Sequence, residues 1–293
     1  MKSVRCLALF LSAALAGGTL WAQEKVSFVN PIIGTNGMGH TFPGACVPFG
    51  LVQLSPDTDT IPHNVDGKYQ PRSYEYCAGY QHKDSSIVGF SHTHFSGTGH
   101  SDLGDILIMP ATGSLKLNPG TATDPDGGYR SRFSHGTEIS RPGYYEVMLA
   151  DYGVKAQLTT TQRVGIHKYT YPTNSENQRI ILDMIHGIYN YDGKVLWTNI
   201  RVENDTLVTG YRITNGWART NYTYFAMSFS KPITHYGCEE KAKVNYRGGY
   251  AKFNMKENFP DIGGRKIVAY FDFDPKTSNE LEVKVALSVV STE

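Results

Sequence analysis

Apolar and polar residues alternate along much of the chain after about residue 144. Residues 154–158 and 166–171 alternate in this way, and Val283, Val285, Leu287 and Val289 fall on one face of residues 281–289. Similar β-rich runs occur at residues 180–185, 196–202, 206–213, 222–229 and 267–273. Because no segment has a sustained helical period, the pattern predicts eight or more strands and almost no helix.

The earlier part of the chain, residues 30–128, has a different texture. It is dense in Gly, Pro, His, Ser, Thr and Asp, with short apolar runs such as residues 51–54 and 106–109. Gly and Pro interrupt it too often for helices, so it predicts long loops between short strands. Strands spaced by about ten residues, without helices between them, favour one large antiparallel β-sandwich over βαβ units.

The first 22 residues have the three parts of a secretory signal peptide. Lys2 and Arg5 give a positive start, residues 7–15 form a short apolar run, and Ala22 precedes a plausible cleavage point. The alternative is a retained membrane anchor. We expect export to the periplasm, the extracellular space or the cell surface, with no membrane span in residues 23–293.

Charge and cysteine content narrow the function classes. The formal net charge is +1 and no Lys/Arg block occurs, which argues against a nucleic-acid surface. Cys46, Cys77 and Cys238 of the expected mature chain are no disulfide framework, and a single bridge among them stays open. The 19 tyrosines suit either core packing or stacking on sugar rings.

Residues 89–105, GFSHTHFSGTGHSDLGD, hold the densest cluster of chemically active side chains. On a strand, His92 and His94 would point to the same face, where two imidazoles can bind a metal. More commonly, such histidines make hydrogen bonds between packed loops, and direct contact with a sugar hydroxyl is the third possibility.

Two further segments have candidate binding residues. Residues 30–50 contain seven Gly and Pro positions from Gly34 to Gly50, which predict a rigid loop at the rim of a site. The segment is not a phosphate-binding loop, because no Lys-Ser/Thr follows it. In residues 74–84, YEYCAGYQHKD, the tyrosines Tyr74, Tyr76 and Tyr80 share one parity and could line one strand face, as core residues or as a sugar platform.

Carboxylate pairs occur in three loops, but each is more typical of turns than of acid and base catalysis. The pairs are Asp57 with Asp59, Asp102 with Asp105, and Asp124 with Asp126. No serine or cysteine lies in a nucleophile elbow.

Long stretches of the chain resemble glycoside hydrolase family 92. The resemblance covers residues 30–58, 77–110 and 142–172, and continues at residues 224–232 and 283–293. It implies an all-β, galactose-mutarotase-like supersandwich with long loops, packed in the family on a carboxy-terminal (α/α)6 barrel. It also implies a calcium-dependent, inverting exo-α-mannosidase acting on mannan or N-glycan chains, whose two carboxyls lie about 6.5–9.5 Å apart.

In this family the barrel supplies the acid, the base and most calcium ligands. We therefore expect residues 23–293 to be the amino-terminal sandwich, with the barrel absent, no catalytic residue and no assigned metal ligand. The expected partners are the missing barrel and an α-mannoside oligosaccharide. By motif position, the candidates for one wall of the sugar pocket are His40, Phe42, Tyr76, Cys77, Gly79, His92, His94, Gly97 and Asp102.

Two other functions stay open, a stand-alone carbohydrate-binding module and a metal enzyme centred on His92 and His94. Family members often have tryptophan where this chain has Tyr74 to Tyr76, which leaves the linkage preference open. If a second domain packs on the loops, residues 34–45 and 97–105 should have an apolar patch near them.

Overall fold

The structure is a computed structural model that describes residues 25–97, 102–242 and 259–293. The expected signal peptide and His100 lie outside these residues. Within the described part, no helix is long and apolar enough to cross a membrane.

The larger of two main sheets has nine antiparallel strands in the order β18-β14-β15-β16-β20-β12-β11-β10-β9. Their bounds are β9 Ile139–Arg141, β10 Tyr144–Leu149, β11 Val154–Thr160, β12 Val164–Thr170, β14 Val195–Asn204, β15 Leu207–Thr214, β16 Asn221–Phe229, β18 Asp261–Gly264 and β20 Glu280–Ser288.

The smaller main sheet has seven antiparallel strands in the order β1-β2-β6-β7-β13-β19-β17. Their bounds are β1 Ala45–Cys46, β2 Gln53–Asp57, β6 Gly89–Ser91, β7 Leu107–Ala111, β13 Gln178–Asp183, β17 Ile233–Glu240 and β19 Ile267–Phe273. Two short ribbons pair β3 Asn64–Val65 with β4 Lys68–Tyr69, and β5 Ser86–Ile87 with β8 Ser131–Arg132. The 3-10 helices are η1 Pro71–Tyr76, η2 Pro125–Gly127 and η3 His135–Thr137.

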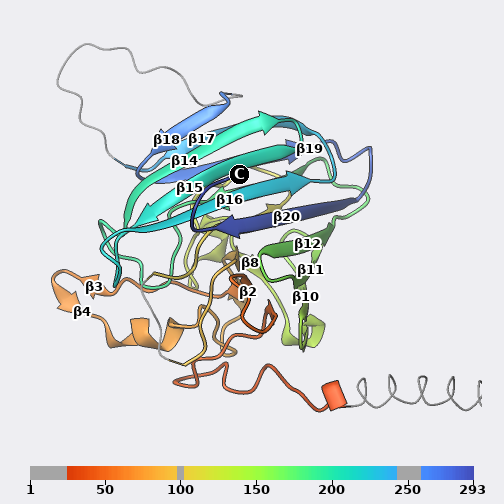
Figure 1. The fold of residues 1–293 in the computed structure, drawn as a ribbon. Coiled ribbons are helices and arrows are strands. Elements are labelled where there is room, and N and C mark those ends of the chain that lie inside the picture. The colour runs from red at the N-terminus through yellow and green to blue at the C-terminus, as the bar shows by residue number, and fades with distance from the viewer. Residues whose placement is uncertain (1–24, 98–101, 243–258) are drawn as a thin grey trace, which may run out of the picture.

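The two main sheets form layers, with β14, β15, β16 and β20 in front of β19 in Figure 1. One continuous apolar cluster contains side chains from both sheets. In β20 the alternation is the one predicted, because Leu281, Val283, Val285 and Leu287 are all buried. Val289 departs from it, since the strand ends at Ser288 and this side chain is 59% exposed. The expected large antiparallel β-sandwich is confirmed.

The smaller sheet is buried on both faces along β13. Residues 112–130 cover part of its outer side, where Leu117 packs against the core and the Tyr129 hydroxyl donates to Asp183. This explains why residues 180–185 have a continuous apolar run rather than an alternating one.

Two local predictions in the loop region were wrong. Tyr74 and Tyr76 lie in η1, not on a strand, because Pro71 starts a helical turn in which the Ser73 and Cys77 amides donate to carbonyls at Gln70 and Tyr74. β6 ends at Ser91, so His92 and His94 follow the strand rather than sharing one of its faces. Cys46, Cys77 and Cys238 form no disulfide with one another.

Candidate functional site

Loops from the first third of the chain gather at one end of the sandwich, coloured red to yellow in Figure 1. The Gly97 amide donates to the His40 carbonyl at 2.8 Å, and the Cys77 thiol lies 3.7 Å from the Gly97 carbonyl. The Gln81 side chain bonds both the amide and the carbonyl of Gly37. The structure therefore brings the three motif segments around residues 34–45, 74–84 and 92–97 together.

His40 is the most unusual residue of this group. Its backbone is left-handed, with φ of 53°, and its side chain is buried although its Nε2 has no hydrogen-bond partner among the described residues. Its ring contacts Tyr74 edge-on, with centroids 4.7 Å apart. A strained backbone and an unsatisfied buried nitrogen at one residue are typical of a functional position.

Phe42 and Tyr76 lie on the same wall. Phe42 is half-buried and its ring packs 5.3 Å from the His94 ring. The buried Tyr76 hydroxyl donates to Asp84 at 3.1 Å, and burial together with that carboxylate raises the pKa of the phenol above its ordinary value. Both rings are held by packing and hydrogen bonds, as a preformed wall requires.

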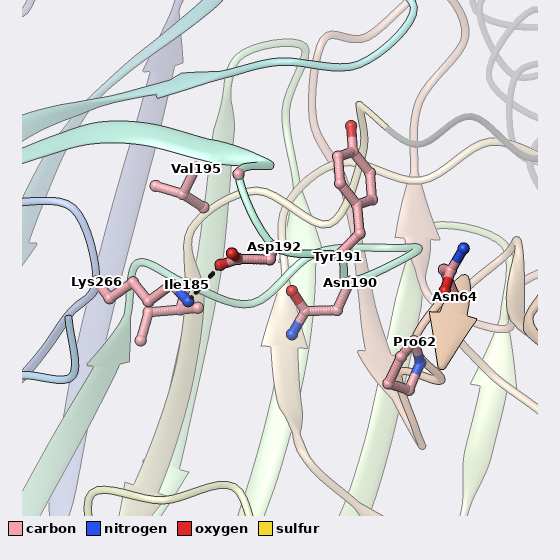
Figure 2. A pocket seen from close by; sticks show the side chains of 9 residues that line it. Pro62, Asn64, Ile185, Asn190, Tyr191, Asp192, Val195 and Lys266 are labelled. Carbon is pink, nitrogen blue, oxygen red and sulfur yellow. Dashed lines mark hydrogen bonds and ion pairs between the residues drawn. The ribbon is translucent and has the colours of Figure 1, made fainter. Parts of the chain in front are cut away.

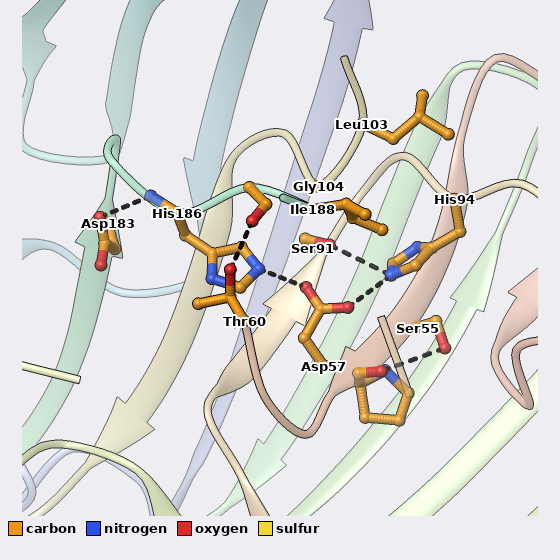
Figure 3. Close-up of polar contacts among 12 residues, drawn as sticks. Ser55, Asp57, Thr60, Ser91, His94, Leu103, Gly104, Asp183, His186 and Ile188 are labelled. Atoms are coloured by element: carbon orange, nitrogen blue, oxygen red, sulfur yellow. Dashed lines mark hydrogen bonds and ion pairs between the residues drawn. The ribbon is translucent and has the colours of Figure 1, made fainter. Parts of the chain in front are cut away.

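Beneath the wall, the Asp57 carboxylate bridges two imidazoles, as Figure 3 shows. Its oxygens lie 2.7 Å from Nε2 of His94 and 2.7 Å from Nε2 of His186. Burial alone would raise the pKa of Asp57, but the two histidines outweigh it and hold the pKa below its usual range. Gly79 passes so close that a Cβ there would lie 2.0 Å from the Asp57 carboxylate.

His92 is fully buried and belongs to a second polar chain. Its Nδ1 faces the Ile106 carbonyl at 2.6 Å, and its Nε2 lies 3.0 Å from Nε2 of His167. Burial lowers the pKa of His92 to about 4. His94 is only 2% exposed. Within this domain, both histidines hydrogen-bond to other parts of the sandwich.

This geometry does not assemble the metal site considered for His92 and His94. Their Nε2 atoms face different partners, His167 and Asp57. Among the residues that the structure describes, the side chains grouped closely enough to hold a metal ion are instead His82, His135 and Glu138.

Asp102 binds the backbone of the turn that contains Trp217, a residue that the sequence interpretation did not include in the site. Its two carboxylate oxygens accept the backbone N–H groups of Trp217 and Ala218 at 3.0 and 3.2 Å. Trp217 lies between β15 and β16, and its side chain is 76% exposed. The sequence signal was present, because Trp217 directly follows Asn215-Gly216, a pair typical of turns, between two β-rich runs.

The Trp217 turn is attached to the same loop group. The Asn215 amide donates to the Lys194 carbonyl at 2.8 Å, and the Lys194 ammonium group donates to the Leu103 carbonyl at 3.4 Å. The Gly104 amide donates to the Thr93 hydroxyl at 3.1 Å. The Trp217 turn is therefore connected, through Lys194 and residues 103–104, to the loop segment around residues 92–97.

A pocket of about 250 Å³ lies next to this region (Figure 2). Pro62, Asn64, Asn190 and Tyr191 are among its lining residues, and Asp192 forms an ion pair with Lys266 there at 2.9 Å. None of the nine predicted residues lines it. Contact between a sugar and those nine residues stays a prediction.

Comparison with known proteins decides the family. The sequence profile of the glycosyl hydrolase family 92 N-terminal domain matches residues 28–288. The chain belongs to this family. A family 92 α-mannosidase from Bacteroides thetaiotaomicron, solved in complex with mannoimidazole, is 39% identical with a TM-score of 0.77, over 91% of this chain and 33% of its own.

Other family 92 relatives agree. An inverting mannosidase from the same organism is 25% identical with a TM-score of 0.67, over 91% of this chain and 32% of its own. An uncharacterized secreted glycosidase from Arthroderma benhamiae is 29% identical over 161 residues, which is 52% of this chain and 18% of that protein. The chain thus spans about a third of the length of the solved family 92 enzymes.

Apolar side chains are exposed on the same loops of this family 92 domain. Met38 is 62% exposed and Phe95 is 51% exposed, while Ile33 and Phe49 are exposed nearby in the sequence. Whether these side chains form one continuous patch against a second domain stays a prediction.

Proposed function

We propose that residues 23–293 form the amino-terminal domain of an exported exo-α-mannosidase and supply one wall of its sugar pocket. Family membership and the α-mannosidases among the solved relatives support this function. The observation that carries the sugar-binding role is the exposed indole of Trp217, held in place by the Asp102 carboxylate. An indole face covers the C–H side of a pyranose while polar groups bind its hydroxyls.

The nine predicted wall residues have different parts in this proposal. His40 shapes the wall through its buried ring, which contacts Tyr74, and Phe42 offers an apolar ring. Tyr76, Cys77, Gly79, His92 and His94 are buried and hold the wall from behind, while Gly97 and Asp102 position His40 and Trp217.

Acid and base catalysis is assigned to a second domain. Glycoside hydrolysis by inversion needs one carboxylic acid and one carboxylate on opposite sides of the scissile bond. The nearby carboxylates of this chain are already engaged, since Asp57 bonds two histidines, Asp105 pairs with Arg212 at 2.5 Å and Asp102 accepts two amides.

The proposal for the full enzyme includes calcium, with most of its ligands in the second domain. Calcium prefers six to eight oxygen ligands. The candidate metal group among the described residues has two imidazoles and one carboxylate, which does not fit calcium. We therefore derive no step through calcium from these residues.

Hydrolysis measurements test whether catalysis requires the second domain. The purified chain should release no mannose from α-mannosides, whereas a version extended by the following domain should release it with inversion. Mannose release by residues 23–293 alone would contradict the proposal. An extended enzyme that is active on other glycosides but not on α-mannosides would contradict the substrate class.

A stand-alone carbohydrate-binding module is the second candidate, and the exposure of Trp217 favours it. Isothermal titration with mannose and mannobiose separates the two functions. Micromolar binding by the chain alone indicates the module. Half a pocket should bind far more weakly, because affinity requires the ligand to be buried on most sides.

A further inference from the structure

Three side chains with metal-binding atoms converge at a place that the proposed function does not use. Ligand atoms of His82, His135 and Glu138 all lie within 4.8 Å of one another. Nδ1 of His135 lies 2.8 Å from a Glu138 oxygen, and the two imidazole rings have centroids 4.0 Å apart.

Glu138 makes this more than a surface cluster. Its side chain is only 3% exposed, and its ion-pair partner among the described residues is His135, whose side chain is 37% exposed. A buried carboxylate is costly unless a cation compensates it. No lysine or arginine is paired with Glu138 in the described part of the chain, so two imidazoles are the groups that face its charge.

Two tyrosine hydroxyls hold this carboxylate in one orientation. The Tyr80 hydroxyl donates to Glu138 at 2.8 Å, and the Tyr145 hydroxyl donates to the same oxygen at 2.6 Å. Ligating carboxylates in metal sites are held by outer hydrogen bonds of this kind.

We propose that His82, His135 and Glu138 bind a divalent transition-metal ion, with Zn²⁺ as the ion of choice. Two imidazoles and one carboxylate are ligands that suit zinc, which then completes its coordination with water. None of these three residues is among the nine predicted wall residues, and two imidazoles with one carboxylate do not suit the calcium that the family resemblance implies.

The ion would fasten separate segments of the wall to one another. His135 is the first residue of η3 and Glu138 directly follows this helix, while His82 follows the loop through Gly79 and Tyr80. The His82 amide also donates to the Thr35 carbonyl at 2.8 Å, in the segment that leads to His40. Bound zinc would therefore stabilise the wall without taking part in hydrolysis.

Titration of the untagged, EDTA-treated protein with ZnCl₂ tests the site. The measurements use the Cys46→Ser background, because Cys46 is an exposed free thiol that could bind zinc itself. We expect one equivalent of zinc with a dissociation constant of about 1 μM or below, and a raised melting temperature. Co²⁺ should give d–d absorption bands without a thiolate charge-transfer band, and CaCl₂ should not compete.

Matched variants locate the ion. His135→Ala should weaken zinc binding about 100-fold, and Tyr80→Phe should weaken it about tenfold because the carboxylate loses a positioning hydrogen bond. His235→Ala is the control, since His235 is 38% exposed and lies 3.6 Å from Asp272, and it should bind zinc like the parent.

The proposal is overturned if the parent shows no saturable zinc binding, or if His135→Ala binds as tightly as the parent. A thiolate charge-transfer band with Co²⁺ would also overturn it. His135→Gln provides a second variant if His135→Ala fails to fold, and unchanged near-ultraviolet circular dichroism identifies the variants that are compared.

Discussion

Nε2 of His92 and Nε2 of His167 lie 3.0 Å apart inside the sandwich. His167 belongs to β12 of the larger sheet, and His92 follows β6 of the smaller one. His92 donates from Nδ1 to the Ile106 carbonyl, so its Nε2 accepts, and His167 donates to it while accepting the Tyr169 hydroxyl on Nδ1. With these tautomers every contact in the chain of bonds is satisfied while both imidazoles are neutral.

Acid should therefore destabilise the domain before its carboxylates titrate. Burial lowers the pKa of His92 to about 4 and holds the pKa of His167 well below its ordinary value. Below about pH 6.5 His92 and His167 become protonated in the unfolded chain, whereas both stay neutral in the folded chain. From pH 6 to 5 the free energy of unfolding should fall by up to about 2.7 kcal/mol, measured by urea denaturation.

His167→Gln should roughly halve this pH dependence. His63→Ala provides the control, because His63 is exposed, and it should keep the full dependence. An unfolding free energy that is flat between pH 7 and 5 in the parent would contradict the neutral pair.

Gly79→Ala should be much more destabilising than Gly67→Ala. Both glycines have a left-handed backbone, with φ of 81° and 76°, but a Cβ at Gly79 meets Asp57 at 2.0 Å while nothing lies within 4 Å at Gly67. We expect a loss of about 1 kcal/mol at Gly67 and about 3–5 kcal/mol at Gly79 in denaturant unfolding. Equal losses would show that the Asp57 network has room to move.

Trp217→Ala should reduce kcat/KM for α-mannosides about tenfold in the extended enzyme, because a sugar loses its stacking surface. Asp102→Ala should give a similar loss by releasing the turn that presents the indole. Trp197→Ala, which removes a 42% exposed tryptophan from β14, is the control and should leave kcat/KM unchanged. An unchanged kcat/KM in Trp217→Ala would show that the indole does not contact the sugar.

The free energy of unfolding should rise between pH 7 and 8, and Lys194→Met should abolish this rise. Burial, together with the nearby Arg212, lowers the pKa of Lys194 to about 7, whereas the unfolded value is about 10.4. The unfolded chain thus binds more protons above pH 7, so stability should rise by up to about 1.4 kcal/mol between pH 7 and 8. Lys68→Met changes an exposed lysine and should retain the rise. A rise that persists in Lys194→Met would show that another group causes it.

The sequence predicted the fold best where alternation is local. The strands β11, β12 and β20 lie within about two residues of their predicted bounds. Alternate residues of a strand point to opposite faces, so buried and exposed positions alternate along the local sequence. Tyr74 and Tyr76 were placed on a strand because parity alone cannot distinguish an extended segment from a 3-10 turn that begins at a proline.

The polar core could not be predicted in this way. Asp57 bonds His186 across 129 positions, and His92 bonds His167 across 75. Nothing in the residues around His186 marks it, since its role depends on loops that meet only in the folded sandwich. The same holds for His135 and Glu138, which face His82 from a different part of the chain.

The position of β20 has a consequence for biosynthesis. β20 pairs with β16 on one side and β12 on the other, so the larger sheet consists of two separate four-stranded halves without it. Residues 280–288 must leave the ribosome before these halves can join. Until then each nascent half exposes an unpaired edge and an apolar face, and such surfaces favour aggregation of a partly folded chain.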